Sequence, residues 1–148
     1  MKSFADLLIT WHAKSGRHHL PWQQSKDPYN VWVSEIMLQQ TQVAIVIDYY
    51  HRFMKKFPTI KALADADEEE VMQLWSGLGY YRRARFLHEG AQMIMEEMEG
   101  VFPSDFHMMM KIPGIGRSTA GAISAFSFNQ KKAILDGNVK RVLSRYFL

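Results

Sequence analysis

Two carboxylates, Glu35 and Asp136, are the candidates for acid–base chemistry in this chain. Glu35 is the only acidic residue between Asp27 and Asp48, and apolar side chains precede and follow it. Burial among such neighbours raises the pKa of a carboxyl group, so that it holds a proton near neutral pH and can donate it. Taken alone, Glu35 is more simply explained as a glutamate on the wet face of an amphipathic helix, and both interpretations stay open.

Asp136 lies in residues 134–141, Ile-Leu-Asp-Gly-Asn-Val-Lys-Arg, where it is expected to cap the last helix. A carboxylate held by backbone N–H groups stays ionised and can stabilise a developing cation. A protonated Glu35 and an ionised Asp136 would form the kind of pair that cleaves bonds to a sugar C1 atom. The sequence does not show that they meet, and helix capping alone also explains Asp136.

A glycine-rich turn at residues 112–121, Ile-Pro-Gly-Ile-Gly-Arg-Ser-Thr-Ala-Gly, has the composition of a phosphate clamp. Gly114 and Gly116 permit positive φ angles and close approach of another backbone. Ser118 or the threonine after it can begin the next helix, whose first N–H groups then face an anion beside Arg117. The pattern is typical of the hairpin in a helix-hairpin-helix DNA-binding motif, with a plain Pro-Gly turn between packed helices as the alternative.

A second glycine-rich stretch, residues 77–85, reads Gly-Leu-Gly-Tyr-Tyr-Arg-Arg-Ala-Arg. Its two tyrosines can wedge between bases while its three arginines hold phosphates. A glycine-broken helix with tyrosines in the core explains it equally well. Three uncharged polar residues can likewise line a polar groove, insert into a helix stack or lie on the surface: Gln39, Gln40 and Thr41.

The charge of the chain is unevenly distributed. The net charge is +3, yet residues 111–148 contain seven of the 18 Lys and Arg and only one of the 15 Asp and Glu. This segment therefore has a balance of +6, while the rest of the chain has −3. A basic segment around the hairpin suits a polyanion such as nucleic acid, although a solvated basic surface is the alternative.

Composition excludes several classes of protein. The 148 residues, 47% hydrophobic and 22% charged, are typical of one folded soluble domain. No apolar run approaches a membrane span and the N-terminus does not resemble a signal peptide, so a cytoplasmic protein without membrane contact is expected. The absence of cysteine excludes disulfides, thiolate zinc sites and cysteine-ligated clusters within this chain, and the six scattered histidines predict no metal site.

Helical periodicity predicts an all-α fold, with no alternating strand pattern of significant length. Ser3 with Asp6 is expected to cap the first helix, and Asn30 the helix that carries Glu35. The predicted helices cover residues 4–15, 31–39, 42–57, 67–76, 86–98 and 136–147, with shorter helices flanking the hairpin. The last helix presents an apolar face, including Val142 and Phe147, that nothing later in the sequence covers.

Five motifs follow one another along the chain. They are Leu-Pro-Trp-Gln at 20–23, Ser-Glu-Ile-Met-Leu-Gln-Gln-Thr-Gln-Val at 34–43, Trp-Ser-Gly-Leu-Gly-Tyr-Tyr at 75–81, the hairpin at 112–118, and the segment 134–141. In this order the set resembles the adenine DNA glycosylases of the MutY type, in the helix-hairpin-helix superfamily. The resemblance implies a six-helix lobe at residues 21–134, with residues 1–20 and 135–148 belonging to an incomplete second lobe.

The resemblance implies an activity, the removal of adenine mispaired with 8-oxoguanine or guanine in double-stranded DNA after base flipping. Glu35 then matches the general acid that protonates the adenine and later handles the attacking water, and Asp136 the group that stabilises the oxocarbenium-like sugar. Positions around the adenine are implied at Arg17 and Trp22. DNA contacts are implied at Gln39, Gln40, Thr41, Tyr80, Arg82, Gly114, Gly116, Arg117, Ser118 and Lys140.

Ser118 separates two branches of the superfamily. Relatives of the endonuclease III type have a lysine at this position that attacks the sugar and adds strand cleavage. The hydroxyl at this position, together with the acid Glu35, favours a monofunctional glycosylase. Lys140 is one turn past Asp136 and leaves an endonuclease III–like lyase as a minor alternative.

The chain departs from the family where it ends. Family members continue with four cysteines that ligate a 4Fe–4S cluster and often with a further domain, and the full-length proteins are expected to be monomers. This chain contains no ligands for that cluster. It therefore resembles a truncated product or fragment, and the alternative function is a weak or inactive DNA-binding module. A monovalent cation held by the hairpin carbonyls is a further expectation.

Overall fold

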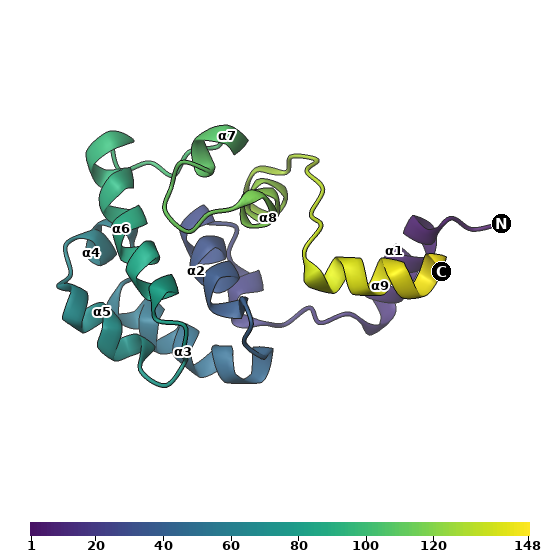
Figure 1. Ribbon diagram of the computed structural model, residues 1–148, viewed down its shortest axis with the longest axis horizontal. Coiled ribbons are helices and arrows are strands. Elements are labelled where there is room, and N and C mark those ends of the chain that lie inside the picture. Colours follow the sequence, from purple (N-terminus) through teal and green to yellow (C-terminus); the bar gives the residue numbers. More distant parts are fainter.

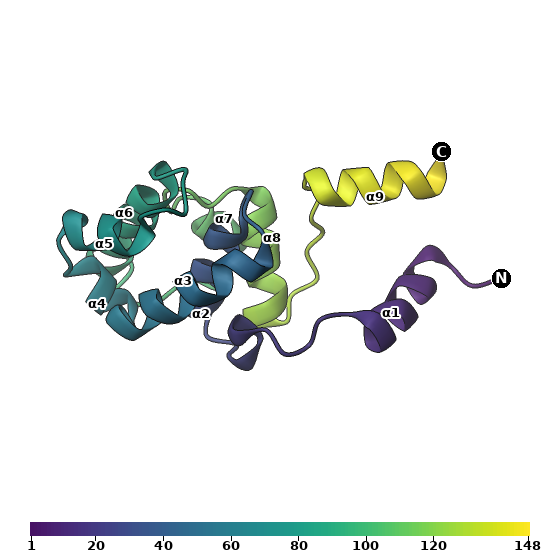
Figure 2. The ribbon, with the colours of Figure 1, turned by 90° about the horizontal axis from the view of Figure 1, so that it is seen from below.

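The computed structural model describes residues 1–148 and confirms the all-α fold, with nine α-helices, one short 3-10 helix and no strand. Helices α2 to α8 pack into one lobe (Figure 1). Helices α1 (Phe4–Ser15) and α9 (Gly137–Phe147) lie outside this lobe, at the end of the molecule where both termini are found (Figure 1, Figure 2). None of the nine α-helices combines the length and the apolar character that a membrane span requires.

Helix α2 (Pro28–Leu38) is the most buried helix of the lobe. Trp32, Val33 and Met37 are fully buried, and the helix packs against both α3 and α8. Asp27 caps α2, since its side chain accepts a hydrogen bond of 2.8 Å from the N–H of Tyr29. The expected cap at Asn30 is therefore wrong: a proline at the first helical position lacks an N–H that would be unpaired there anyway, so the helix begins earlier.

The other elements of the lobe surround α2. Helix α6 packs against α4 and α5, while α8 packs against α2 and against its neighbour α7. The core they enclose is rich in aromatic side chains, among them Phe53 and Trp75, whose rings are 6.1 Å apart. The elements are η1 (Pro21–Gln24), α3 (Val43–Lys56), α4 (Ile60–Ala64), α5 (Glu68–Trp75), α6 (Arg82–Glu97), α7 (Phe106–Met109) and α8 (Arg117–Phe128).

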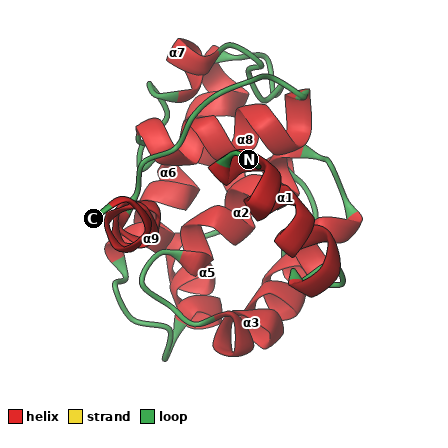
Figure 3. Ribbon diagram, turned by 90° about the vertical axis from the view of Figure 1, so that its right-hand side faces the viewer, coloured by secondary structure: helices red, strands yellow, loops and turns green.

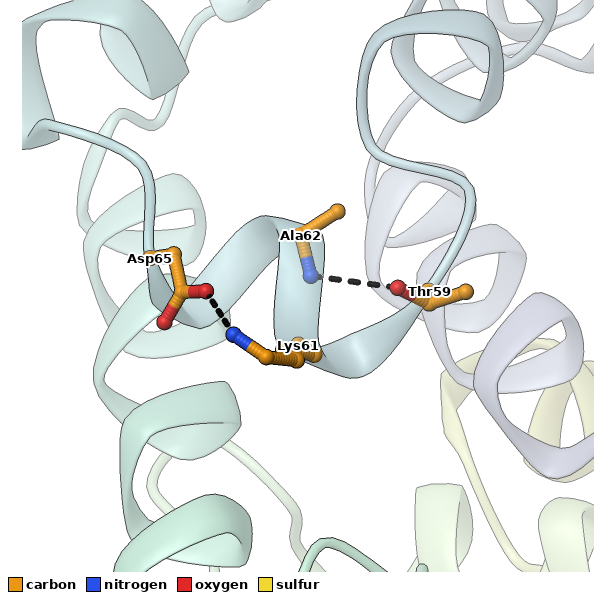
Figure 4. Close-up of polar contacts among 4 residues, drawn as sticks. All are labelled: Thr59, Lys61, Ala62 and Asp65. Carbon is orange, nitrogen blue, oxygen red and sulfur yellow. Dashed lines mark hydrogen bonds and ion pairs between the residues drawn. The ribbon is translucent and has the colours of Figure 1, made fainter.

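Local polar contacts hold the short helix α4. The hydroxyl of Thr59 accepts a hydrogen bond of 3.1 Å from the N–H of Ala62, and Lys61 forms an ion pair with Asp65 one turn later (Figure 4). A helix of five residues is not stable by itself in water. Burial of Leu63 against the core and packing on α6 therefore stabilise α4 within the lobe.

Extended segments connect the lobe to the outer helices, residues 16–20 before η1 and residues 129–136 after α8. Figure 3 looks onto the end of the molecule that carries α1 and α9. Neither helix buries a residue, although the ring of Phe4 contacts that of Tyr146 at 4.6 Å between centroids. Phe147 is 66% exposed, which confirms the uncovered apolar face of α9. The lobe boundaries at residues 20 and 134 stay predictions.

Candidate active site

A groove of about 950 Å³ lies on the lobe where α2, the start of α6, the hairpin and the start of α9 approach one another. Its walls come from residues 35–40, 80–87, 113–119 and 134–138, which are far apart in the sequence. The groove brings together eight of the predicted site residues: Glu35, Gln39, Gln40, Tyr80, Arg82, Gly114, Ser118 and Asp136.

Glu35 lies on the third turn of α2, half-buried at the floor of this groove. Its helical neighbours Ser34 and Ile36 are buried, so the carboxyl group is largely withdrawn from water. This burial, followed in size by repulsion from Asp136, raises the pKa of Glu35 from 4.5 to about 7. None of the three ion pairs of the structure involves Glu35. The side chain is therefore an acid that carries a transferable proton near neutral pH.

Asp136 is the N-cap of α9, as predicted, and lies in the same groove as Glu35. Its Oδ1 atom accepts a hydrogen bond of 2.8 Å from the N–H of Val139. The side chain lies at the N-terminal end of α9, which is the positive end of the helix dipole. One groove thus contains a carboxyl group whose pKa is raised by burial and a second one that caps a helix, which suits them to different roles.

Gly121 explains how the chain returns from α8 to the groove. A Cβ atom at this position would lie 3.0 Å from Cγ2 of Ile134 and 3.2 Å from the carbonyl oxygen of Ala133. Only a residue without a side chain leaves room for the segment after α8 to pass so close to that helix. The close passage leads the chain to Asp136, which lies at the end of the segment and lines the groove.

The hairpin between α7 and α8 forms a second wall. Gly114 has φ +79°, and a Cβ atom there would lie 3.0 Å from Cβ of Phe86, so both its conformation and its surroundings require glycine. Gly116 has φ −90° and is the N-cap of α8. The chain thus adopts a positive φ at Gly114 but not at Gly116, and α8 begins at Arg117, one residue before the expected start at Ser118 or Thr119. Because no side chain caps α8, its first N–H groups are available to an anion.

The three arginines that follow the tyrosine pair make different contacts. Arg82 lines the groove with its guanidinium 4.8 Å from the centroid of the Phe86 ring. Arg85 forms an ion pair of 3.0 Å with Glu68 outside the groove, and Arg83 donates hydrogen bonds to backbone carbonyls. In this structure Arg83 and Arg85 contact groups within the protein, and phosphate binding by these arginines stays a prediction.

Six predicted site residues lie outside the groove in this structure. Trp22 is buried with its ring 5.5 Å from that of Tyr50, and Thr41 accepts a hydrogen bond from Arg83. The guanidinium of Arg117 lies 5.8 Å from the centroid of a phenylalanine ring. The others are exposed, in the segment after α1, at the cap of α8 and on α9: Arg17, Gly116 and Lys140. Their roles stay predictions.

Eleven of the 19 residues that line the groove are not among the predicted site residues, and they include Tyr81, Arg83, Phe86, Pro113 and Asn138. Phe86 and Asn138 carry no sequence signal for the groove, because their place there depends on contacts between distant helices. Pro113 and Tyr81 stand beside predicted site residues, so the motifs around them could have indicated them. Arg83 differs, because its role depends on several carbonyl groups more than 40 residues away.

The chain offers no ligands for an iron–sulfur cluster. It contains no cysteine, and no group of three or more His, Asp or Glu residues is arranged to hold a metal ion. The four-cysteine set implied by the resemblance therefore does not fit the residues present.

Sequence comparison identifies relatives over nearly the whole chain. Adenine DNA glycosylases of Buchnera aphidicola, Rattus norvegicus and Homo sapiens are 51%, 49% and 47% identical to it, each match covering 97% of the chain. The chain spans 41% of the length of the Buchnera protein and 29% and 28% of the two mammalian ones. The matched region is therefore less than half of each relative.

Solved structures share the fold. A thermostable thymine-DNA glycosylase matches with a TM-score of 0.90 and 28% identity, over 97% of this chain and 66% of that one. A non-covalent endonuclease III–DNA complex matches with a TM-score of 0.80 and 23% identity, over 96% of this chain and 68% of that one. The hairpin and groove lie within residues 33–148, which match the model of the HhH-GPD superfamily. The chain belongs to the HhH-GPD superfamily of base excision DNA repair proteins.

Proposed function

We propose that this chain contains the catalytic groove of a monofunctional adenine DNA glycosylase, which hydrolyses the N-glycosidic bond of adenine mispaired with 8-oxoguanine or guanine. The observation that carries the proposal is the carboxyl pair, with Glu35 of pKa about 7 in the same groove as the N-cap Asp136. The names of relatives about 50% identical to the chain support the choice of base.

Glu35 acts as the general acid in this proposal. An adenine flipped from the duplex into the groove accepts the proton of the Glu35 carboxyl group at a ring nitrogen. The bond between the sugar C1′ and the base then breaks, and its electron pair leaves with the adenine. A water molecule attacks C1′ and gives its proton to the Glu35 carboxylate, which restores the acid. The reaction therefore consumes only the water molecule and leaves Glu35 protonated as at the start.

Asp136 stabilises the cationic sugar formed when the base departs. Its position is fixed by the N–H of Val139 at the start of α9, so it needs no reorganisation during the reaction. Asp136 also adds to the raised pKa of Glu35, which keeps the proton on Glu35 until the adenine takes it.

The hairpin supplies the DNA contact in this proposal. The uncapped N–H groups at the start of α8 bind a backbone phosphate without reading sequence. Ser118 stands at this point with a hydroxyl group, which cannot form a Schiff base with the sugar, so base removal without strand cleavage is expected. Tyr80, which is 63% exposed, enters the base stack in this proposal.

A single-turnover assay on a duplex with one adenine opposite 8-oxoguanine tests the proposal. The 148-residue chain should release adenine, and Glu35→Gln should lower the rate constant by about 10²–10⁴-fold, the usual contribution of a general acid. Glu96→Gln, which changes an exposed glutamate on α6, is the matched control and should keep the wild-type rate. Base release by wild type no faster than by Glu35→Gln contradicts the proposal for this chain.

A DNA-binding module without catalysis is the second candidate. It is favoured by the exposed faces of α1 and α9 and by the 41% of the Buchnera relative that the chain spans. Binding to duplex that weakens with salt, with no adenine release, is its signature.

The minor alternative, an endonuclease III–like lyase, predicts a borohydride-trapped DNA adduct that Lys140→Ala abolishes.

Four further expectations stay predictions. A 4Fe–4S cluster and a monomeric state belong to longer family members, and the spectrum and mass of the native gene product test them. The monovalent cation at the hairpin is tested by exchanging sodium or potassium for a bulky organic cation at constant ionic strength. Duplex affinity should then fall if hairpin carbonyls hold the ion. A cytoplasmic location is tested by cell fractionation.

A further inference from the structure

Arg83 joins two turns at the rim of the groove that are about 40 residues apart in the sequence. Its Nη1 atom donates to the carbonyl oxygens of Ile36 (2.9 Å), Met37 (3.0 Å) and Gln39. Its Nη2 atom donates to the carbonyl of Gly79, at 3.2 Å. One guanidinium group thus joins the C-terminal end of α2, where carbonyls lack the usual N–H partner four residues later, to the turn before α6.

Each turn contains a residue other than glycine in the left-handed region. Gln40 has φ 57° and Tyr80 has φ 47°, which is unusual for any residue with a side chain and more so for a bulky one. Such conformations are unfavourable and persist only where the surrounding structure holds them. Both residues line the groove.

Two of the four carbonyl groups that Arg83 binds directly precede these two residues. The carbonyl of Gln39 shares a rigid peptide plane with the N atom of Gln40, so fixing that plane limits the φ of Gln40. The carbonyl of Gly79 stands in the same relation to Tyr80. One side chain therefore restrains both left-handed residues through their preceding peptide groups.

Aromatic rings keep the guanidinium of Arg83 in place. It lies 5.4 Å from the ring centroid of Trp75 and 5.6 Å from that of Tyr80. The indole Nε1–H of Trp75 also donates to the carbonyl of Gly79, at 3.1 Å. With its Nη1 and Nη2 donors directed to carbonyl groups and to the Thr41 hydroxyl, and with aromatic rings beside it, Arg83 is arranged to act within the protein rather than on a DNA phosphate.

We propose that Arg83 is a positioning residue that holds the turns at residues 39–41 and 79–81 together, so that Gln40 and Tyr80 project into the groove as one unit. The effect of Arg83 on base release rests on the proposed glycosylase function, whereas its effect on the two turns in the free protein does not. Lysine cannot replace Arg83 in this role, since a single ammonium group cannot reach several carbonyls on both turns.

The test compares Arg83→Lys with Arg85→Lys, a matched change on the same helix outside the groove. In Arg83→Lys the single-turnover rate constant at saturating protein should fall by about 10–100-fold, as expected when a reacting group is misplaced. Its Kd for the duplex and its salt dependence should stay within about twofold of wild type, because the charge is retained. Arg85→Lys should change none of these quantities. Millimolar methylguanidinium should restore part of the rate of Arg83→Ala.

Amide hydrogen exchange in the free protein tests the same idea without DNA. The amides of Gln39 and Arg83 donate to the carbonyls of Ile36 (3.3 Å) and Tyr80 (3.0 Å), so each reports on one turn. In Arg83→Lys both amides should exchange at least about tenfold faster, while the amides of α3 keep their wild-type rates.

Several results overturn the proposal. Unchanged exchange in either turn shows that Arg83 does not couple them, and faster exchange throughout the lobe shows general destabilisation. A weaker Kd with a smaller salt dependence in Arg83→Lys assigns Arg83 to a phosphate contact. If wild type releases no adenine, the glycosylase proposal fails, and the exchange result alone decides the role of Arg83.

Discussion

Replacing Glu35 with glutamine should make the protein more stable at neutral and alkaline pH while removing its acid. Burial, followed by repulsion from Asp136, raises the pKa of Glu35 to about 7 in the folded chain, above the 4.5 of a free glutamate. The folded state therefore binds this proton more tightly than the unfolded state does. Between pH 4.5 and 7 the wild-type protein loses stability as pH rises, because folding then requires a buried charge.

The size of the effect follows from the two pKa values. A difference of about 2.5 corresponds to about 3 kcal/mol of unfolding free energy, since each pKa unit is about 1.4 kcal/mol. Glutamine has the shape of the protonated side chain and cannot ionise, so Glu35→Gln keeps this free energy at all pH values. For a domain of this size the gain amounts to about 6–12 °C in Tm above pH 7 and falls toward zero below pH 4.5.

Thermal unfolding followed by circular dichroism at pH 4.5, 6, 7 and 8.5 measures this difference. Glu96→Gln, on the exposed side of α6, is the control for loss of a negative charge, and its Tm should follow wild type at every pH. If Glu35→Gln and wild type have the same Tm at pH 8.5, the carboxyl group is not held in its protonated form. In that case the proposed role of Glu35 as a general acid, which rests on its raised pKa, also fails.

Three further outcomes are expected. The single-turnover rate of base release should fall about tenfold per pH unit above pH 7 as Glu35 ionises, and a flat profile to pH 8.5 contradicts this. Asp136→Asn keeps a good N-cap for α9 but removes the charge. Its base release should fall by about 10²-fold or more, and the pKa of Glu35, followed by carboxyl NMR, should decrease. Gly114→Ala should lower the unfolding free energy by about 1–2 kcal/mol, because of its φ of +79° and the nearby Phe86. Gly116→Ala, with φ −90° and no atom within 4 Å, should keep the Tm of wild type; equal losses in both refute this reasoning.

The features that depend on neighbouring residues were predictable from the sequence. Ser3 and Asp6 form the expected reciprocal cap of α1, and Asp136 caps α9, because these contacts span only three residues. The helical pattern also placed Glu35 on α2 among apolar neighbours. The start of α2 was harder to predict, because two candidate caps lie close together. Asp27 with its following proline begins the helix before Asn30.

The features that depend on packing were not predictable. The groove requires α2 and α8 to lie together and the chain to pass closely over Gly121, and no pattern around Asp136 carries that information. The role of Arg83 is a similar case, since an arginine that binds carbonyls and one that binds phosphates look alike in sequence. The N-cap of α8 is Gly116, although the sequence also offers a serine and a threonine nearby as helix starts.

The position of Asp136 ties the lobe to the helix outside it. Asp136 stands where residues 129–136 meet α9, whereas Glu35 belongs to the central helix of the lobe. Because Asp136 contributes to the raised pKa of Glu35, the proton affinity of Glu35 depends on where α9 lies. A partner that drew α9 away from the groove would leave Glu35 more readily ionised, and one that seated it would keep the proton bound. The position of the peripheral helix α9 thereby sets how readily Glu35 gives up its proton.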